Sequence, residues 1–118
     1  MNVEDAMKKL MSINGAIAAM VVDSDSGMIL AQAGGGINLD LAAAGNTEVV
    51  RAKRKTMASL KLDDHIEDML ITLGKQFHVL RPLKNKQNIF IYSVLERANA
   101  NLAMARLVIS DVEESIKF

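Results

Sequence analysis

Two short runs of almost unbroken apolar residues, one towards each end of the chain, most constrain the fold. They cover residues 16–22, A-I-A-A-M-V-V, and residues 89–95, I-F-I-Y-S-V-L. An apolar run this short, with little polar alternation, predicts a strand that is covered on both faces. Because only the centre of a sheet offers such cover, we expect the two runs to lie side by side there. Helices must then cover both faces of one mainly antiparallel sheet.

Three segments have the periodicity of amphipathic helices, and Asn2 and Asn38 can cap the first two. The first covers residues 3–12, the second follows Asn38 and runs to about Leu60, and the third runs from about Ala98 to Ser115. Asparagine is a favoured N-cap, and apolar side chains recur at helical spacing in the first and third segments and less regularly in the second. These segments supply the cover that the apolar strands need.

A first hairpin joins residues 16–22 to a strand at residues 28–33. The connection Asp23–Gly27 is rich in Asp, Ser and Gly, which is typical of a turn. Gly34–Gly36 follows as a flexible joint between the second strand and the long helix.

A second hairpin covers Ile66–Leu83. Its turn lies at Leu73–Gln76, where we expect Gly74 to supply the positive φ of a tight turn. Glu67 and Asp68 place two charges at the head of its first strand, which indicates a sheet margin rather than a sheet centre.

The predicted order of elements is therefore α-ββ-α-βββ-α, in one domain of 118 residues, with a polar loop at residues 84–88 before the last strand. Lys+Arg and Asp+Glu balance at 14 each, so no basic field favours nucleic acid. The chain has no Cys, which excludes disulfide and thiolate chemistry and fits the cytoplasm. No apolar run approaches the roughly 20 residues of a membrane helix. We expect a soluble cytoplasmic protein without membrane insertion.

No pattern in the sequence predicts an enzyme, a cofactor or a metal site. Asp23 and Asp25 lack the further ligands of a cation loop, and Gly34–Gly36 lacks the lysine of a phosphate-binding loop. His65 and His78 do not have metal-ligand spacing. We expect a structural role for each of these features.

Two features of the long helix have both a structural and a functional interpretation. Arg51, Arg54 and Lys55 share one helical face, which is either solvated or a docking surface for an acidic partner. The small residues Ala42–Gly45 either pack closely on the protein's own sheet or allow a second copy of the helix to approach.

Taken together, these segments resemble the Roadblock/LC7 family, which includes light chains of dynein. The resemblance covers nearly the whole chain. Within the family, the chain is most similar to small stand-alone bacterial members, especially actinobacterial ones. The residues that support it are Gly15–Asp23, Ser26–Ala31, Leu41–Asn46, Glu67–Gly74, Phe77–Pro82 and Asn101–Arg106.

The resemblance implies a profilin-like α+β fold, with a five-stranded antiparallel sheet in the order 2-1-5-4-3. It also implies a homodimer in which strand 3 pairs with its copy and helix 2 lies beside its copy. We therefore expect a dimer interface at Ala43, Gly45, Val49, Asp68, Leu70, Ile71 and Thr72.

Family members regulate or scaffold small Ras-like GTPases without supplying catalytic groups, so this is the function that the resemblance implies. Two alternatives stay open. The abundance of Met residues, which pack adaptably, would suit a small-molecule sensor domain. The chain could also be a structural subunit that pairs with other Roadblock chains.

Overall fold

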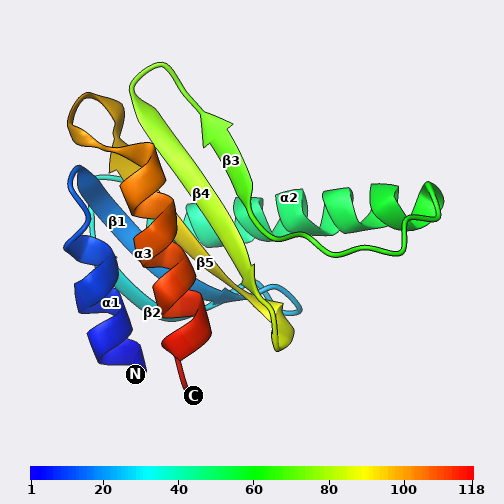
Figure 1. The fold of residues 1–118 in the computed structure, drawn as a ribbon. Coiled ribbons are helices and arrows are strands. Elements are labelled where there is room, and N and C mark those ends of the chain that lie inside the picture. Colours follow the sequence, from blue (N-terminus) through cyan, green and yellow to red (C-terminus); the bar gives the residue numbers. More distant parts are fainter.

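The structure is a computed structural model that describes residues 1–118 (Figure 1). Its elements follow the predicted order α-ββ-α-βββ-α, with one short 3₁₀ turn, η1, added before the last helix. They are α1 (Val3–Met11), β1 (Ala16–Asp23), β2 (Met28–Gly34), α2 (Leu39–Ser59), β3 (Met69–Thr72), β4 (Gln76–Leu83), β5 (Lys86–Glu96), η1 (Arg97–Asn99) and α3 (Leu102–Ser115).

The strands form one antiparallel sheet in the order β2-β1-β5-β4-β3. The two apolar runs lie in its middle as β1 and β5, paired with each other from Ala16–Leu95 to Asp23–Ile89. The register between β1 and β2 shifts between Val21 and Val22, which marks a bulge near that edge. The central pairing predicted from burial is confirmed.

Helices cover both faces of the sheet, as predicted (Figure 1). The side of the sheet that faces α1 and α3 carries one apolar cluster, with Leu10, Ile91 and Ile109 among its members. The other side faces α2 and carries a second cluster around Met20, Phe90 and Tyr92. Alternate residues of β1 and β5 enter opposite clusters because successive side chains of a strand point to opposite faces.

Each α-helix begins after an asparagine whose side chain caps the first turn. The Oδ1 atoms of Asn2, Asn38 and Asn101 accept hydrogen bonds from the backbone N–H groups three residues further on, at 2.8, 3.0 and 3.1 Å. Such caps satisfy backbone donors that have no partner within the helix. None of the helices combines the length and hydropathy required to cross a lipid bilayer.

Three local expectations were wrong. The last helix begins at Leu102 rather than near Ala98, because the chain first makes the 3₁₀ turn and then a new asparagine cap. The last strand begins at Lys86, so the polar loop is shorter than predicted, because pairing with β4 extends as far as Leu83. Gly74 does not have a positive φ. The strands are separated by three residues there, and such loops are often built around a turn whose central residues have negative φ.

Candidate protein-interaction site

The outer edge of β3 is one of two open edges of the sheet, because β3 pairs only with β4. The N–H of Leu73 donates to the carbonyl oxygen of Gln76 at 2.8 Å, so it points towards β4. Backbone groups of successive strand residues point to opposite edges. The N–H of Ile71 therefore points towards β4, whereas those of Leu70 and Thr72 point outwards. Each of these two residues offers a donor and an acceptor to another strand.

The two faces of β3 differ. Met69 and Ile71 pack against the apolar cluster on the α2 side. Leu70 lies opposite Val79, whose side chain belongs to the cluster under α1 and α3, and it is 38% exposed. The strand therefore combines an open backbone edge with an incompletely covered apolar side chain.

Helix α2 crosses the sheet and its later half extends beyond β3 (Figure 1). The large apolar side chains of Leu60 and Leu62, at the end of the helix and just after it, are exposed. The open strand edge and the projecting helix lie on the same side of the molecule, so both are available to one partner.

The interface residues expected on α2 separate into two groups. Ala43 is 1% exposed and packs against the protein's own sheet, as one of the two interpretations of this segment allowed. Gly45 is exposed and has no atom within 4 Å of the place where a Cβ would lie. Val49 is 36% exposed. Gly45 and Val49 are thus accessible to a second helix, and the side chain of Ala43 is not.

The three basic residues expected to bind a partner do not form one free face. Arg51 donates to the backbone carbonyl of Asp25, and Arg54 donates to that of Gln87. These contacts attach α2 to the β1–β2 turn and to the start of β5. Burial lowers the pKa of Arg54, and the nearby Asp25 opposes that shift. Lys55 is exposed and has no ion pair.

A cluster of charged residues lies on the opposite side of the sheet, at the head of β3. The carboxylate of Asp68 accepts two hydrogen bonds from Arg106 of α3, both at 2.9 Å. It also lies 3.8 Å from Arg81 of β4, which in turn contacts Glu113 of α3 at 3.3 Å. Asp68 was expected at the interface, but its side chain is only 12% exposed and is held within its own chain.

Arg81, Arg106 and Glu113 were not predicted as site residues from the sequence. Arg81 lies among the apolar residues at the end of β4, which was the one available signal, because a charge at such a position requires a partner. Its partner Glu113 is 32 residues away in the sequence.

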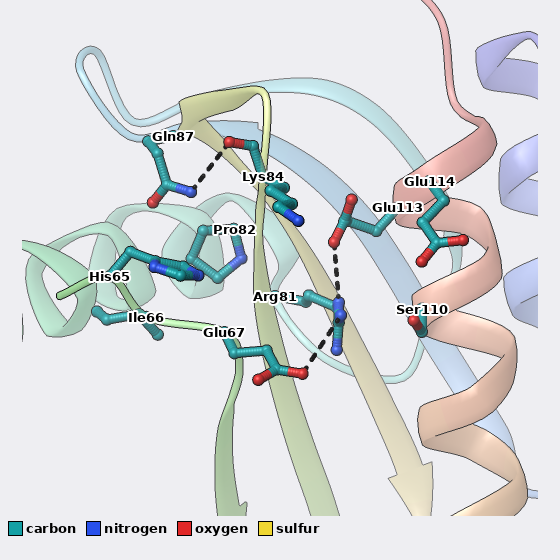
Figure 2. A pocket seen from close by; sticks show the side chains of 10 residues that line it. All are labelled: His65, Ile66, Glu67, Arg81, Pro82, Lys84, Gln87, Ser110, Glu113 and Glu114. Atoms are coloured by element: carbon teal, nitrogen blue, oxygen red, sulfur yellow. Dashed lines mark hydrogen bonds and ion pairs between the residues drawn. The ribbon is translucent and has the colours of Figure 1, made fainter.

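A polar cavity of about 330 Å³ opens beside this cluster. Figure 2 shows Arg81 at its centre, with Glu67 on one side and Glu113 on the other. The remaining lining residues are His65, Ile66, Pro82, Lys84, Gln87, Ser110 and Glu114. The mixture of acidic and basic groups suits a polar ligand better than an apolar one.

The residues weighed for metal or phosphate chemistry have structural partners. Asp23 closes its own turn, since Oδ1 accepts the N–H of Asp25 at 2.9 Å. The ring of His78 is hydrogen-bonded to the side chains of Gln76 and Tyr92. His65 lies in the segment that follows α2 and is exposed. No group of three or more His, Cys, Asp or Glu side chains is placed to hold a metal ion.

No protein-family model matches the sequence, and no curated protein matches it. Solved structures do match it. A Roadblock/LC7 domain from Streptomyces avermitilis aligns with a TM-score of 0.83 at 12% identity, over 98% of this chain and 94% of that one. MglB of Myxococcus xanthus aligns with a TM-score of 0.81 at 14% identity, over 93% and 87%.

A further MglB structure, described as having a tetrameric arrangement, aligns with a TM-score of 0.81 at 16% identity, over 95% of this chain and 82% of that one. These likenesses establish the fold: the chain has the architecture of Roadblock/LC7 domains. The resemblance found in the sequence is confirmed at that level.

Proposed function

We propose that this chain is a homodimeric, non-catalytic regulator or scaffold of a small Ras-like GTPase in the cytoplasm of a bacterium. The observation that carries the proposal is the open β3 edge lying on the same side as the projecting half of α2. The Roadblock/LC7 fold supports the choice of partner, because the family resemblance implies regulation of such GTPases.

The charge distribution along α2 favours self-association. The acidic residues Asp40 and Glu48 lie in the first half of the helix, and the four basic residues 51 and 53–55 lie in the second. A two-fold axis that sets two copies of α2 antiparallel brings each acidic half beside a basic half. The opposed helix dipoles favour the same arrangement.

We place the interface on two elements. In β3, Leu70 and Thr72 would exchange backbone hydrogen bonds with the second copy. Ile71 and Asp68 would hold the strand in place through contacts within their own chain. In α2, Gly45 and Val49 would meet the second helix, while Ala43 sets the height of the helix above its own sheet.

We place the contact with the GTPase on the exposed part of the basic helix, at Arg51 and Lys55. The side chain of Arg51 is half exposed in spite of its bond to the β1–β2 turn. Arg54 would act only indirectly, by holding the helix to the start of β5. Such a surface suits an acidic patch on the partner.

Proline substitutions in β3 test the homodimer. Leu70→Pro removes an outward N–H, so the monomer is expected to fold and self-association to be lost at micromolar protein. Ile71→Pro removes a donor to β4 and is expected to destabilise the monomer itself. Light scattering measures the mass and circular dichroism checks the fold. A folded Leu70→Pro variant that stays as dimeric as the wild type excludes β3 as the seam.

Calorimetry tests the GTPase partner. The probe is a purified small Ras-like GTPase encoded near this protein, loaded with GDP or with a non-hydrolysable GTP analogue. We expect binding that depends on the nucleotide and weakens in an Arg51→Glu/Lys55→Glu variant. No heat in either nucleotide state, together with an unchanged rate of GTP hydrolysis, contradicts the proposal.

The polar cavity beside Arg81 favours one second candidate, a sensor of a small polar molecule. Thermal-shift measurements across a panel of charged metabolites test it, with Arg81→Gln as the control. If no metabolite raises the melting temperature of the wild type, the sensor hypothesis fails. Binding of another Roadblock chain without any GTPase would instead support a structural assembly subunit.

A further inference from the structure

An arginine from outside the strand holds each end of β3. At the head, Arg106 of α3 binds the carboxylate of Asp68, the residue just before the strand. At the tail, Arg97 of η1 donates from Nη1 to the backbone carbonyl of Leu73, the residue just after the strand, at 2.9 Å. The two contacts bracket all four residues of the strand.

The contact at the head is geometrically specific. Nε and Nη2 of Arg106 bind different oxygens of Asp68, so the guanidinium and the carboxylate form two parallel hydrogen bonds. A lysine cannot reproduce this geometry. Arg81 also lies 3.8 Å from the same carboxylate. On another side, Arg81 contacts Glu113 of α3 at 3.3 Å (Figure 2). The head of β3 is therefore tied to both β4 and α3.

The contact at the tail is reinforced by its neighbours. The N–H of Arg97 donates to the carbonyl of Lys75 at 3.0 Å, which attaches η1 to the β3–β4 turn. The guanidinium of Arg97 also lies 5.3 Å from the centre of the Phe77 ring, within the range of a cation–π contact. The side chain is thus directed at the end of β3.

These contacts bear on self-association because, apart from the packing of Met69 and Ile71, β3 is held only along its pairing with β4. The strand has four residues, hydrogen-bonds to β4 alone and follows residues 60–68, which form no helix or strand. A partner that binds an already extended edge loses less conformational entropy than one that must order it. Contacts that keep the edge extended therefore strengthen its pairing without touching the partner.

We infer that Arg106 and Arg97 are positioning residues that hold β3 extended and so set the strength of pairing between two copies of this chain. The inference rests on the proposed homodimer. Both residues are exposed, and the side chain of Arg106 is 49% exposed, so their loss is expected to loosen β3 without unfolding the protein.

The test compares Arg106→Ala, Arg106→Lys and Arg97→Ala with the wild type in two measurements. Sedimentation gives the dimer Kd, and hydrogen exchange gives the protection of the Ile71 and Leu73 amides, which point towards β4. We expect each alanine variant to weaken the dimer about tenfold, with faster exchange confined to β3 and its flanks. Arg106→Lys is expected to fall between the wild type and Arg106→Ala.

Two further variants make the comparison specific. Asp111→Asn removes the exposed ion pair of α3 with Lys9, on the side away from β3, and is expected to change neither measurement. In an Asp68→Asn background, Arg106→Ala is expected to have little additional effect, because the interaction is already weakened.

The outcomes distinguish a failure of the proposed homodimer from a failure of the inference about Arg106 and Arg97. A wild type that is monomeric at every concentration contradicts the homodimer, whereas the exchange measurement still tests the arginines on the monomer. A dimeric wild type whose Kd and exchange are unchanged by Arg106→Ala and Arg97→Ala overturns the inference and leaves the homodimer intact.

Discussion

The hydroxyl oxygen of Tyr92 lies 2.9 Å from Nδ1 of His78, on the side of the sheet that faces α2. The two rings meet edge to face, with their centres 5.5 Å apart. Nε2 of His78 lies 2.8 Å from Oε1 of Gln76, so both ring nitrogens have partners. Burial lowers the pKa of His78 and raises the pKa of Tyr92, while a hydrogen bond with Asn46 opposes the shift at Tyr92. Both side chains are therefore neutral near pH 7.

The lowered pKa of His78 predicts that acid weakens the fold. Above a pH of about 6.5 the imidazole is neutral in the folded and the unfolded chain and adds nothing to the pH dependence. As the pH falls below that value, the unfolded chain takes up a proton that the folded chain resists, so the free energy of unfolding falls. Urea unfolding between about pH 7.5 and 5.5 measures this dependence.

Replacing His78 is expected to flatten that dependence. His78→Gln removes the titrating group, so the unfolding midpoint should change less over the same pH range, even if the variant is less stable throughout. His65→Gln is the matched control, because His65 is exposed and lies outside the Tyr92 network. An equal slope in wild type and His78→Gln contradicts the assignment.

Two buried hydroxyl groups without partners predict stabilising substitutions. The Oγ of Ser93 and the Oγ1 of Thr47 have no hydrogen-bond partner. Ser93→Ala and Thr47→Val remove these groups with little change in shape, and each is expected to stabilise the protein by about 1 kcal/mol. Ser24→Ala should do the opposite, because the buried Ser24 hydroxyl donates to the carbonyl of Asn88 at 2.9 Å. Chemical unfolding compares the three; destabilised Ser93 and Thr47 variants would mean that these hydroxyls do have partners.

Gly34 is expected to tolerate no side chain. Its φ is +79°, and a Cβ there would lie 2.2 Å from the carbonyl oxygen of Ile17. Gly34→Ala should therefore lower the free energy of unfolding by more than about 2 kcal/mol. At Gly35, which has no positive φ and no atom within 4 Å of an added Cβ, alanine should change it by less than about 0.5 kcal/mol. Similar effects at the two positions would argue against the close approach.

Substitution of Gly45 is expected to affect the stability of α2 and the strength of self-association in opposite directions. In the monomer, a Cβ added at Gly45 has no atom within 4 Å, so Gly45→Ala should stabilise the monomer by about 1 kcal/mol. If a second copy of α2 packs against this position, the same methyl group should weaken the dimer. Thermal unfolding at low concentration measures the first effect and sedimentation the second. Tighter self-association in the variant would place the helix contact elsewhere.

The centre of the sheet could be predicted from the sequence because burial on both faces leaves a direct signal. Residues 16–22 are all apolar and residues 89–95 are interrupted only by Tyr92 and Ser93, and the two runs lie in the paired strands β1 and β5. The caps at Asn2 and Asn38 could be predicted for a similar reason, since capping depends on residues three positions apart.

The details of the candidate site could not be predicted in this way. Arg106 and Asp68 are 38 residues apart, and no local pattern indicates that they meet. The small residues Ala42–Gly45 leave the rotation of α2 undetermined, so the inward position of Ala43 depends on tertiary packing. Arg54 had the pattern of a surface charge, yet it donates to the backbone carbonyl of Gln87 at the start of β5.

The extra residue of β2, Leu30, opposite Val21 and Val22, bears on how far an assembly of this chain can grow. The proposed pairing through β3 would use one margin of each sheet and leave β2, with its exposed Met28 and Leu30, at both ends of the joined sheet. A regular β2 would allow a third and a fourth copy to add without limit, as in a fibre. A bulge increases the local twist, so the outer edge of β2 is less able to pair with a further strand. The irregularity thus favours termination at a closed pair over polymerisation.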